Sequence, residues 1–280
     1  MLPKITVAMP AYNAGRYIEE AIESVLCQEG VDLELLVVDD GSTDDTADIV
    51  GKIDDTRCRL LQNPYKRGIG NAHNRVVRES QAPIVSHVDA DDRLRRGALA
   101  KMVRALEANP RVGLAHCYFF DIDAQGETTL GAFRERRRNF LRERPVDLDY
   151  RVALRNSPAK ANHLRTYRRD ALLELGDFNE ELSSGIDYEM ALRLLERYEI
   201  RLVPEFLYAR RVHSSNTTES LSRAQLWWLK YRIRRSVLRR GQVTYWSDAN
   251  FDPGYFLLGE ARRLRHRLRS RPERKEARRP

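Results

Sequence analysis

Through the first 120 residues, short apolar runs alternate with stretches in which apolar residues recur every three or four positions. A short run bounded by turn residues is typical of a buried strand, whereas a recurrence near 3.6 residues is typical of an amphipathic helix. The short runs predict five strands, at residues 5–9, 33–38, 58–62, 82–88 and 112–120. The longer stretches predict four helices, at residues 18–26, 42–53, 70–80 and 93–107.

This alternation predicts parallel strand pairing, because right-handed crossovers return each strand beside an earlier one. We expect an α/β fold with a doubly wound, mixed but mostly parallel sheet that has helices on both faces. The basic segment 134–145 has no apolar face and predicts a mobile surface loop, with contact to substrate as the alternative. A later helix should run through residue 197, with an apolar face formed by Tyr188, Ala191, Leu192 and Leu195.

Polar residues that favour helix N-caps stand at or before the start of several predicted helices. Such a side chain accepts a hydrogen bond from a free backbone N–H of the first turn, and a carboxylate also favours the positive end of the helix dipole. The expected caps are Asn13 and Ser42 or Thr43, while capping by Asp91 or Asp92 and by Asp187 is an alternative to other roles of these acids.

The composition predicts a globular protein with a sizeable core, since 42% of the 280 residues are hydrophobic. No apolar run approaches the roughly 18 residues needed to span a bilayer, and the N-terminus does not have the layout of a signal peptide. We therefore expect a cytoplasmic protein. Three cysteines, Cys27, Cys58 and Cys117, lack the spacing of a zinc or redox site, so we interpret them as buried, reduced thiols.

The formal net charge of +8 is concentrated near the C-terminus, where residues 221–280 contain 17 Lys and Arg against 5 Asp and Glu. Residues 223–240 predict a basic amphipathic helix, with Leu226, Leu229, Ile233 and Val237 on one face. We favour packing of this face onto the main domain, and peripheral contact with an anionic membrane is the alternative. Residues 262–280 are too polar for a core and predict disorder. No recognisable nucleic-acid reader accompanies the basic residues, so we expect no nucleic-acid partner.

Acidic residues follow two of the predicted strands. Asp39 and Asp40 end the second strand, and Asp89, Asp91 and Asp92 end the fourth. Because the carboxyl ends of parallel strands meet at one rim, these carboxylates should lie near each other and suit Mg²⁺ or Mn²⁺. Capping of the next helix would explain one or two of the three acids after the fourth strand. A turn at Gly41 with an N-cap at Ser42 or Thr43 would explain the segment after the second strand but leave Asp39 without a role.

Four segments in this order resemble the family 2 glycosyltransferases, whose nucleotide-diphospho-sugar domain has the GT-A fold. The segments lie within residues 3–110 and read VAMPAYNAGRYIEEAIESVLCQ, ELLVVDDGSTDDT, NPYKRGIGNAHN and IVSHVDADDRL. A looser match, GDFNEELSSGIDYEMALRL at residues 176–194, resembles the acceptor-side motif of the same family. The resemblance implies transfer of a sugar from a nucleoside diphosphate to an acceptor hydroxyl, with inversion of the anomeric configuration.

The resemblance also implies the residues of the donor site. The nucleotide would be lined by Pro10, Ala11, Tyr12, Asn13, Asp39, Lys66, Arg67, Asp89 and Ala90. Asp39 would accept a hydrogen bond from the imide N–H of a uracil-type base, since a carboxylate only accepts. Mn²⁺ or Mg²⁺ would be held by Asp91 directly, with Asp89, Asp92 and His213 beside it. For Lys66 and Arg67, ordinary surface charge is the alternative, and for His213 a loop histidine without a role.

Asp187 matches the position of the general base in this family. A role as helix N-cap is compatible with this role. The family often has an acidic residue just before this Asp, whereas this chain has Ile186. The departure puts a helper carboxylate in doubt.

The expected function is a divalent-metal-dependent, inverting hexosyltransferase that uses a UDP-sugar in glycan or cell-envelope polysaccharide biosynthesis. The acceptor would be a glycan, a lipid-linked intermediate or a small glycoside. Because the Q-x-x-R-W segment and membrane helices of processive synthases are missing from the sequence, we expect non-processive transfer. We expect a catalytic domain at residues 1–220, divided into a nucleotide-sugar half (1–110) and an acceptor half (111–220), and a mainly helical basic extension at 221–280.

Three other functions fit parts of the pattern. A sugar-1-phosphate nucleotidyltransferase would share sheet, nucleotide and metal, but the glycine- and arginine-rich first loop is missing. A dinucleotide oxidoreductase would have GxGxxG after the first strand, where this chain has PAYNAG. A catalytically inactive nucleotide-sugar-binding or membrane-adaptor protein is disfavoured by the intact acids. The expected location is the cytoplasm, with peripheral contact at the inner face of the membrane as the alternative.

Overall fold

The computed structural model describes residues 2–128 and 163–213, together with positions 229, 231–233, 235 and 237 of a helical segment. The strands are β1 (Ile5–Ala11), β2 (Leu33–Asp39), β3 (Cys58–Gln62), β4 (Ile84–His87), β5 (Arg93–Leu94), β6 (Val112–Ile122), β7 (Arg165–Arg168) and β8 (Glu199–Arg211). They form one eight-stranded sheet in the order β3-β2-β1-β4-β7-β6-β8-β5. Each of the five predicted strands is present.

The first half of the sheet is parallel, as the alternating pattern predicts. β1 pairs in parallel with β2 and with β4, and β2 pairs in parallel with β3. β7 then runs antiparallel between β4 and β6, so a strand from the second half of the chain separates two strands of the first half. β8 is parallel to β6, and the short β5 pairs antiparallel with β8 at the edge. The sheet is therefore mixed but mostly parallel.

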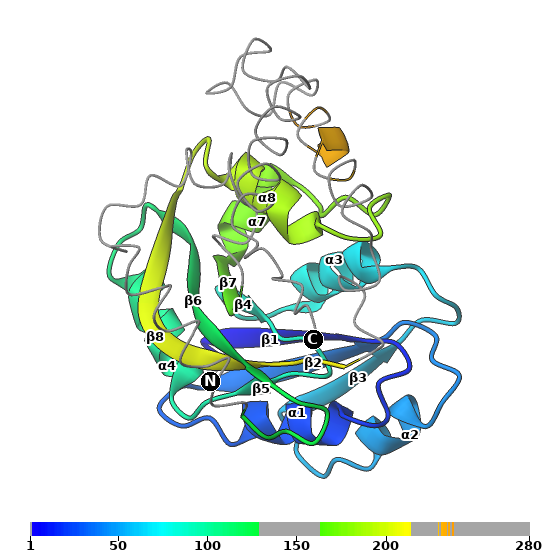
Figure 1. Cartoon of the computed structure of the whole chain (residues 1–280). Coiled ribbons are helices and arrows are strands. Elements are labelled where there is room, and N and C mark those ends of the chain that lie inside the picture. The colour runs from blue at the N-terminus through cyan, green and yellow to red at the C-terminus, as the bar shows by residue number, and fades with distance from the viewer. Residues whose placement is uncertain are drawn as a thin grey trace, which may run out of the picture.

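Helices cover both faces of this sheet (Figure 1). They are α1 (Ile18–Leu26), α2 (Thr46–Gly51), α3 (Ile69–Glu79), α4 (Ala98–Glu107), α7 (Arg169–Leu175) and α8 (Ile186–Leu194). Apolar side chains of α1, α2 and α4 form one core with the sheet, and those of α3, α7 and α8 form the other. Because β2 is covered on both faces, all seven of its residues are buried, which explains its continuous apolar run. The fold class predicted from the sequence is confirmed.

The helix predicted to begin at Arg93 begins five residues later. Arg93 and Leu94 form β5 by pairing with β8, and α4 starts at Ala98 after Gly97, which has a φ of 72°. The prediction was wrong because pairing with a distant strand overrides the local helical periodicity. Asp91 and Asp92 therefore do not cap this helix.

The other predicted caps are also wrong. The N-caps are Tyr17 in α1, Asp45 in α2 and Gly185 in α8, and none of these helices has a side-chain cap hydrogen bond. Asn13, Ser42 and Thr43 instead hydrogen-bond one another and join two loops. Their side chains find partners across the sheet edge before the helices begin.

Two further expectations concern the surface of the molecule. Among the three free cysteines, Cys117 is buried and Cys58 is half-buried, but Cys27 is exposed because it follows α1 on the solvent side. The prediction of buried thiols is therefore wrong for Cys27. Among the described residues, no helix combines the length and the apolar character needed to cross a bilayer. The predicted loop at 134–145 and the predicted disorder at 262–280 lie outside the described residues.

The described part of the C-terminal segment packs onto the domain. Ile233 and Val237 are 2% and 0% exposed and belong to the core formed with α7 and α8. A Cβ placed on Gly185 would lie 2.8 Å from the Cδ1 of Ile233, so the two segments are in direct contact. Arg232 and Arg235 are exposed. For these positions, the preferred interpretation of the amphipathic helix is confirmed.

Candidate active site at the carboxyl edge of the sheet

The turn after β4 carries the acids that end this strand, and β8 anchors it. The buried Asp92 accepts a hydrogen bond from the hydroxyl of Tyr208 at 2.6 Å and another from the backbone N–H of Arg211 at 2.6 Å. The same Tyr208 hydroxyl accepts a hydrogen bond from the backbone N–H of Asp89 at 3.2 Å. A single strand residue thus fixes both ends of the acidic turn.

Asp91 is held by two residues from the end of β8. The Nε of Arg211 donates to the backbone oxygen of Asp91 at 2.8 Å, and the Nε2 of His213 lies 2.9 Å from its carboxylate Oδ2. Arg211 is only 1% exposed, and its guanidinium also pairs with Glu20 of α1. His213 was predicted beside the acids, and the structure places it there. Arg211 was missed, because an arginine in a basic stretch carries no local signal of burial.

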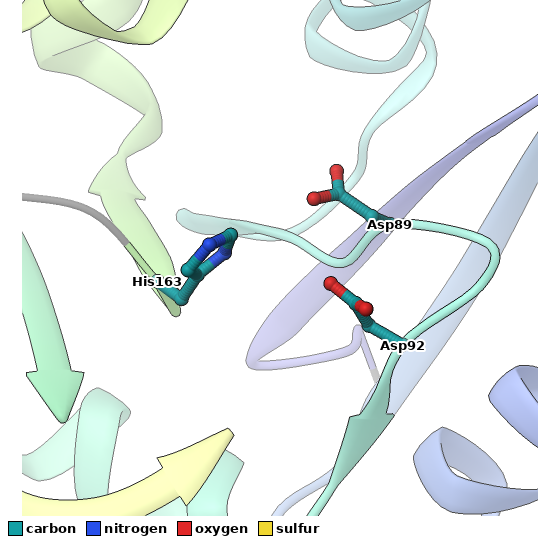
Figure 2. A group of neighbouring side chains, drawn as sticks. All are labelled: Asp89, Asp92 and His163. Carbon is teal, nitrogen blue, oxygen red and sulfur yellow. The ribbon is translucent and has the colours of Figure 1, made fainter. Parts of the chain in front are cut away.

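Three side chains around this turn lie close enough to hold a metal ion together. The ligand atoms of Asp89, Asp92 and His163 all lie within 4.8 Å of one another, with His163 facing the acids from the segment before β7 (Figure 2). Burial raises the pKa of Asp92 well above its usual value, and repulsion from Asp91 and Asp89 adds to this. Burial also raises the pKa of Asp89, with Asp91 and Asp187 adding to the shift and Arg165 opposing it. A cation between these groups would relieve the repulsion.

This donor set fits the ions expected from the sequence. Carboxylate oxygens suit Mg²⁺ and Mn²⁺, and an imidazole nitrogen is a better ligand for Mn²⁺ than for Mg²⁺. The chain therefore contains a cluster that could bind a divalent metal. His163 was not predicted, since it belongs to no motif and reaches the acids only because β7 inserts beside β4. The choice of Asp91 as the direct ligand stays a prediction.

The loops after β1 and β2 are bound to each other at the nucleotide-binding positions expected from the sequence. Ala11 and Asp39 are register partners at the ends of these strands. The carboxylate of Asp39 accepts the backbone N–H of Ser42 at 3.0 Å, which leaves acceptor capacity on its oxygens. Asn13 has a φ of 51°, and its side chain accepts the backbone N–H of Thr43 at 2.8 Å. These contacts shape the edge beside the buried Asp39.

An aromatic ring and a lysine lie together at the mouth of this region. Tyr12 is 41% exposed, and the Nζ of Lys66 lies 3.6 Å from the centroid of its ring, which is a cation–π contact. Asp40 holds the loop that carries Lys66, because it accepts the backbone N–H groups of Arg67 and Gly68 at 2.9 and 2.8 Å. Asp40 is thus an anchor of the loop, which the sequence did not reveal.

The acceptor-side motif docks on α3 through amide and carboxylate groups. Glu180 accepts hydrogen bonds from the side chains of Asn71 and Asn74 on this helix. The amide of Asn74 also donates to the backbone oxygen of Phe178. A Cβ on Gly70 would lie 3.0 Å from the backbone of residues 179 and 180, so any larger residue would press on this backbone. The two halves of the chain are therefore joined at α3, directly after the loop that carries Lys66.

Asp187 lies in the first turn of α8 and faces the acidic turn. Its Oδ2 accepts a hydrogen bond from the Nη1 of Arg165 at 2.8 Å, and the Nη2 of Arg165 lies 3.7 Å from Asp89. Because Gly185 is the N-cap, Asp187 does not have the capping role that was its alternative. Arg165 thus lies near both Asp187 and Asp89, the first acid of the turn after β4.

The position before Asp187 carries no acid, and none of its neighbours on α8 replaces one. Ile186 is 4% exposed and packs in the core with α3 and α7. Glu189, also on α8, is buried in an ion pair with Arg193 at 2.9 Å. Among the described residues of α8, Asp187 is therefore the carboxylate that faces the site.

The predicted residues thus gather along one edge of the sheet. Because β1 lies between β2 and β4, the loops after β1 and β2 and the acidic turn after β4 all follow neighbouring strands. Pro10 and Ala90 occupy these strand ends, Pro10 within β1 and Ala90 in the turn, where it is 7% exposed. Arg67 differs from the rest, since its described contacts are the backbone bond to Asp40 and an electrostatic interaction with Glu180. The edge combines carboxylates, cations and an exposed aromatic ring.

The relatives of the chain include an uncharacterized protein and a hyaluronan synthase, both from bacteria. It is 32% identical over 251 residues to the uncharacterized protein MT1568 of Mycobacterium tuberculosis, covering 87% of this chain and 75% of that protein. It is 25% identical over 253 residues to the hyaluronan synthase of Pasteurella multocida, covering 90% of this chain. The chain spans only 25% of that synthase, so it corresponds to one part of the larger protein.

Two solved structures share the fold. The S. aureus TarS fragment 1–349 in complex with UDP-GlcNAc superposes with a TM-score of 0.64 at 20% identity, covering 84% of this chain and 66% of that one. The mannosyltransferase PcManGT from Pyrobaculum calidifontis, in complex with GDP-Man and Mn²⁺, superposes with a TM-score of 0.63 at 24% identity, covering 85% and 65%.

The sequence comparison extends over most of the described domain. The model of the family described as Glycosyl transferase family 2 matches residues 6–176, a range that contains the donor-side loops and the acidic turn. Together with the GT-A fold and the carboxylates gathered at its edge, this match shows that the chain is a glycosyltransferase and belongs to glycosyl transferase family 2.

Proposed function

We propose that this glycosyltransferase transfers a hexosyl group from a UDP-sugar to an acceptor hydroxyl with inversion, in glycan or cell-envelope polysaccharide biosynthesis. The observation that carries the proposal is that Asp187 and Asp89, from the two halves of the chain, approach one buried guanidinium. Inverting transfer requires a base on one side of the reacting carbon and a charged donor site on the other side.

The donor side supports a uridine nucleotide. Asp39 is buried at the strand end with free acceptor capacity, and the exposed ring of Tyr12 offers a face on which a base can stack. Lys66 lies over that ring and would approach the diphosphate together with Arg67, which follows it in the same loop. TarS shares this fold and was solved with UDP-GlcNAc, whereas PcManGT was solved with GDP-Man. The nucleobase of the donor is therefore a question for experiment.

Mn²⁺ or Mg²⁺ would be held directly by Asp91, with Asp89, Asp92 and His163 as further ligands and His213 beside Asp91. When bound, such an ion stabilises the negative charge that develops on a departing diphosphate. The Mn²⁺ in the PcManGT complex supports this assignment.

In the proposed reaction, Asp187 accepts the proton of the acceptor hydroxyl while the hydroxyl oxygen forms a bond to the anomeric carbon. The bond from that carbon to the diphosphate oxygen breaks, and the electron pair leaves with the nucleoside diphosphate. The Nη1 of Arg165 donates a hydrogen bond to the Asp187 carboxylate at 2.8 Å and would orient it toward the acceptor hydroxyl. We propose non-processive transfer by a catalytic domain at residues 1–220, with 221–280 as an extension.

The experiment begins with a donor screen. A thermal-shift panel of UDP-, GDP- and dTDP-sugars, with and without Mn²⁺, identifies the donor, because a bound ligand raises the unfolding temperature. We expect UDP-sugars with Mn²⁺ to give the largest shift, and Asp91→Asn to abolish the dependence on Mn²⁺. Release of pyrophosphate from a sugar-1-phosphate and UTP would instead identify a nucleotidyltransferase.

With that donor, Asp187→Asn should lower the transfer rate at least about 100-fold, because the base is lost, while donor binding is retained. Asp170→Asn is the matched control, since Asp170 is an exposed acid of α7 outside the acceptor-side motif at residues 176–194. Product is followed by NMR, which also reports the anomeric configuration. Transfer by Asp187→Asn at the wild-type rate, or a product with retained configuration, would refute the proposal.

A further inference from the structure

Arg165 is a buried cation between acids that come from different parts of the chain. It is 8% exposed, and its guanidinium lies 2.8 Å from the Oδ2 of Asp187 and 3.7 Å from the Oδ1 of Asp89. Asp187 belongs to α8, whereas Asp89 belongs to the turn after β4. No other Lys or Arg among the described residues has ion pairs to both acids. The planar fork of an arginine can contact two carboxylates at once, which an ammonium group does less well.

The sheet sets the place of this guanidinium. Arg165 on β7 is the register partner of His87 on the antiparallel strand β4. His87 lies two residues before Asp89 in the sequence. The neighbouring rings of His73 and His87 are stacked with centroids 3.8 Å apart and are buried. Burial and the nearby Arg165 lower the pKa of His73 to about 3, so this neighbour is neutral at pH 7. The charge of Arg165 is therefore balanced mainly by the two carboxylates.

We propose that Arg165 is a positioning residue that couples the two halves of the site: it orients the Asp187 carboxylate and competes with the divalent cation for Asp89. The inference rests on the proposed function, because it takes Asp187 as the base and Asp89 as a metal ligand. When a cation binds Asp89, the two positive charges repel each other, and the guanidinium is left to pair with Asp187. Metal binding and base orientation are then linked, and the linkage works in both directions.

This role predicts opposite changes in two measurements. In Arg165→Gln, kcat should fall about 100-fold, because the base is no longer held in place. The affinity for Mn²⁺ should rise about threefold or more, because the competing positive charge is gone. A purely structural arginine would behave differently, since its loss would loosen the acidic turn and weaken Mn²⁺ binding together with kcat.

The experiment uses the full chain and MnCl₂, with free Mn²⁺ measured by electron paramagnetic resonance. Arg165→Lys keeps the charge but cannot contact both acids, so its Mn²⁺ affinity should be close to wild type while kcat stays low. Arg168→Gln is the matched control, because Arg168 lies on the same strand and donates to backbone oxygens of residues 106, 109 and 112, away from the acids. It should leave both measurements unchanged.

Weaker Mn²⁺ binding in both Arg165→Gln and Arg165→Lys, or an unchanged kcat in Arg165→Gln, would overturn the inference. The two proposals fail separately. If the wild-type chain transferred no sugar from any donor, the proposed function would fail, while the Mn²⁺ measurement would still decide whether Arg165 competes for Asp89.

Discussion

Tyr208 shows how one uncharged residue can organise a charged site. It lies in β8 and is 0% exposed, yet its hydroxyl contacts both Asp89 and Asp92. Its ring stacks on His163 with centroids 4.6 Å apart, so it touches every member of the candidate metal cluster. Loss of a residue that orients metal ligands by hydrogen bonds typically lowers metal affinity about 10- to 100-fold.

Tyr208→Phe should therefore weaken Mn²⁺ binding about tenfold while the ring stacking is kept. The variant should also lose about 1–3 kcal/mol of stability, because a buried carboxylate oxygen loses its donor. Isothermal titration with MnCl₂ and urea unfolding measure the two effects. Tyr198→Phe is the control, since the hydroxyl of Tyr198 contacts only the exposed Glu174 among the described residues. Equal Mn²⁺ affinity in both variants would contradict the role of Tyr208.

The helical segment described at positions 229, 231–233, 235 and 237 reaches the start of α8, the helix that carries Asp187. Ile233 contacts Gly185, which has a φ of 77° and no Cβ to block the approach. Ile233 and Val237 extend the core of α3, α7 and α8. The apolar face is thus occupied at these positions by the protein itself, while Arg232 and Arg235 face solvent.

Ile233→Ala should cost about 2–4 kcal/mol of unfolding free energy, as expected for a core position. Arg235→Ala should change it by less than about 0.5 kcal/mol, because the side chain is exposed. Urea unfolding compares the two variants. Similar small losses in both would mean that the segment is not packed in solution. Flotation of the chain with anionic liposomes, before and after Ile233→Ala, tests the membrane alternative for the same face.

For the whole molecule, the buried histidine pair links folding to pH. His73 is 1% exposed, and its pKa is lowered to about 3 by burial, with Arg165 adding to the shift. The pKa of His87 is lowered well below its usual value for the same first reason. Both rings are therefore neutral in the folded protein at pH values where they are protonated in the unfolded chain. Since the unfolded state then binds more protons, stability falls as the pH drops below about 6.5.

His73→Phe removes one of these titrations and keeps a ring that can stack on His87. Between pH 7.5 and pH 5, the wild type should lose about 2 kcal/mol more unfolding free energy than the variant, because the stability linked to the neutral histidine is full above about pH 6.5 and declines toward pH 3. Urea unfolding at several pH values provides the difference, and the carboxylates, which titrate in both proteins, cancel in it. Parallel curves for the two proteins would show that His73 is not buried as a neutral ring.

The part of the site that depends on short sequence segments could be predicted, whereas the part that depends on contacts between distant residues could not. The sequence predicted that Asp39, Asp89 and Asp91 lie at one edge, because they stand at or just after the ends of apolar strands and the carboxyl ends of parallel strands share an edge. The family resemblance implied Asp187 and His213, and the roles of these residues stay predictions. His163, Arg165, Tyr208 and Arg211 were missed, because their neighbours in the chain say nothing about their partners in the acidic turn. In the sequence, Asp89 lies 74 positions from His163, 76 from Arg165 and 119 from Tyr208, and Asp91 lies 120 positions from Arg211.

By itself, the sequence determined the alternation of strands and helices, the buried central strands and the acids that follow them, since these depend on periodicity and on short segments. The tertiary structure alone decided that β7 inserts antiparallel between β4 and β6, that Arg93 and Leu94 pair with β8, and that one guanidinium joins Asp89 to Asp187. These features depend on contacts between segments that are far apart in the sequence. Such contacts stabilise the protein only once the sheet has assembled and brought the segments together.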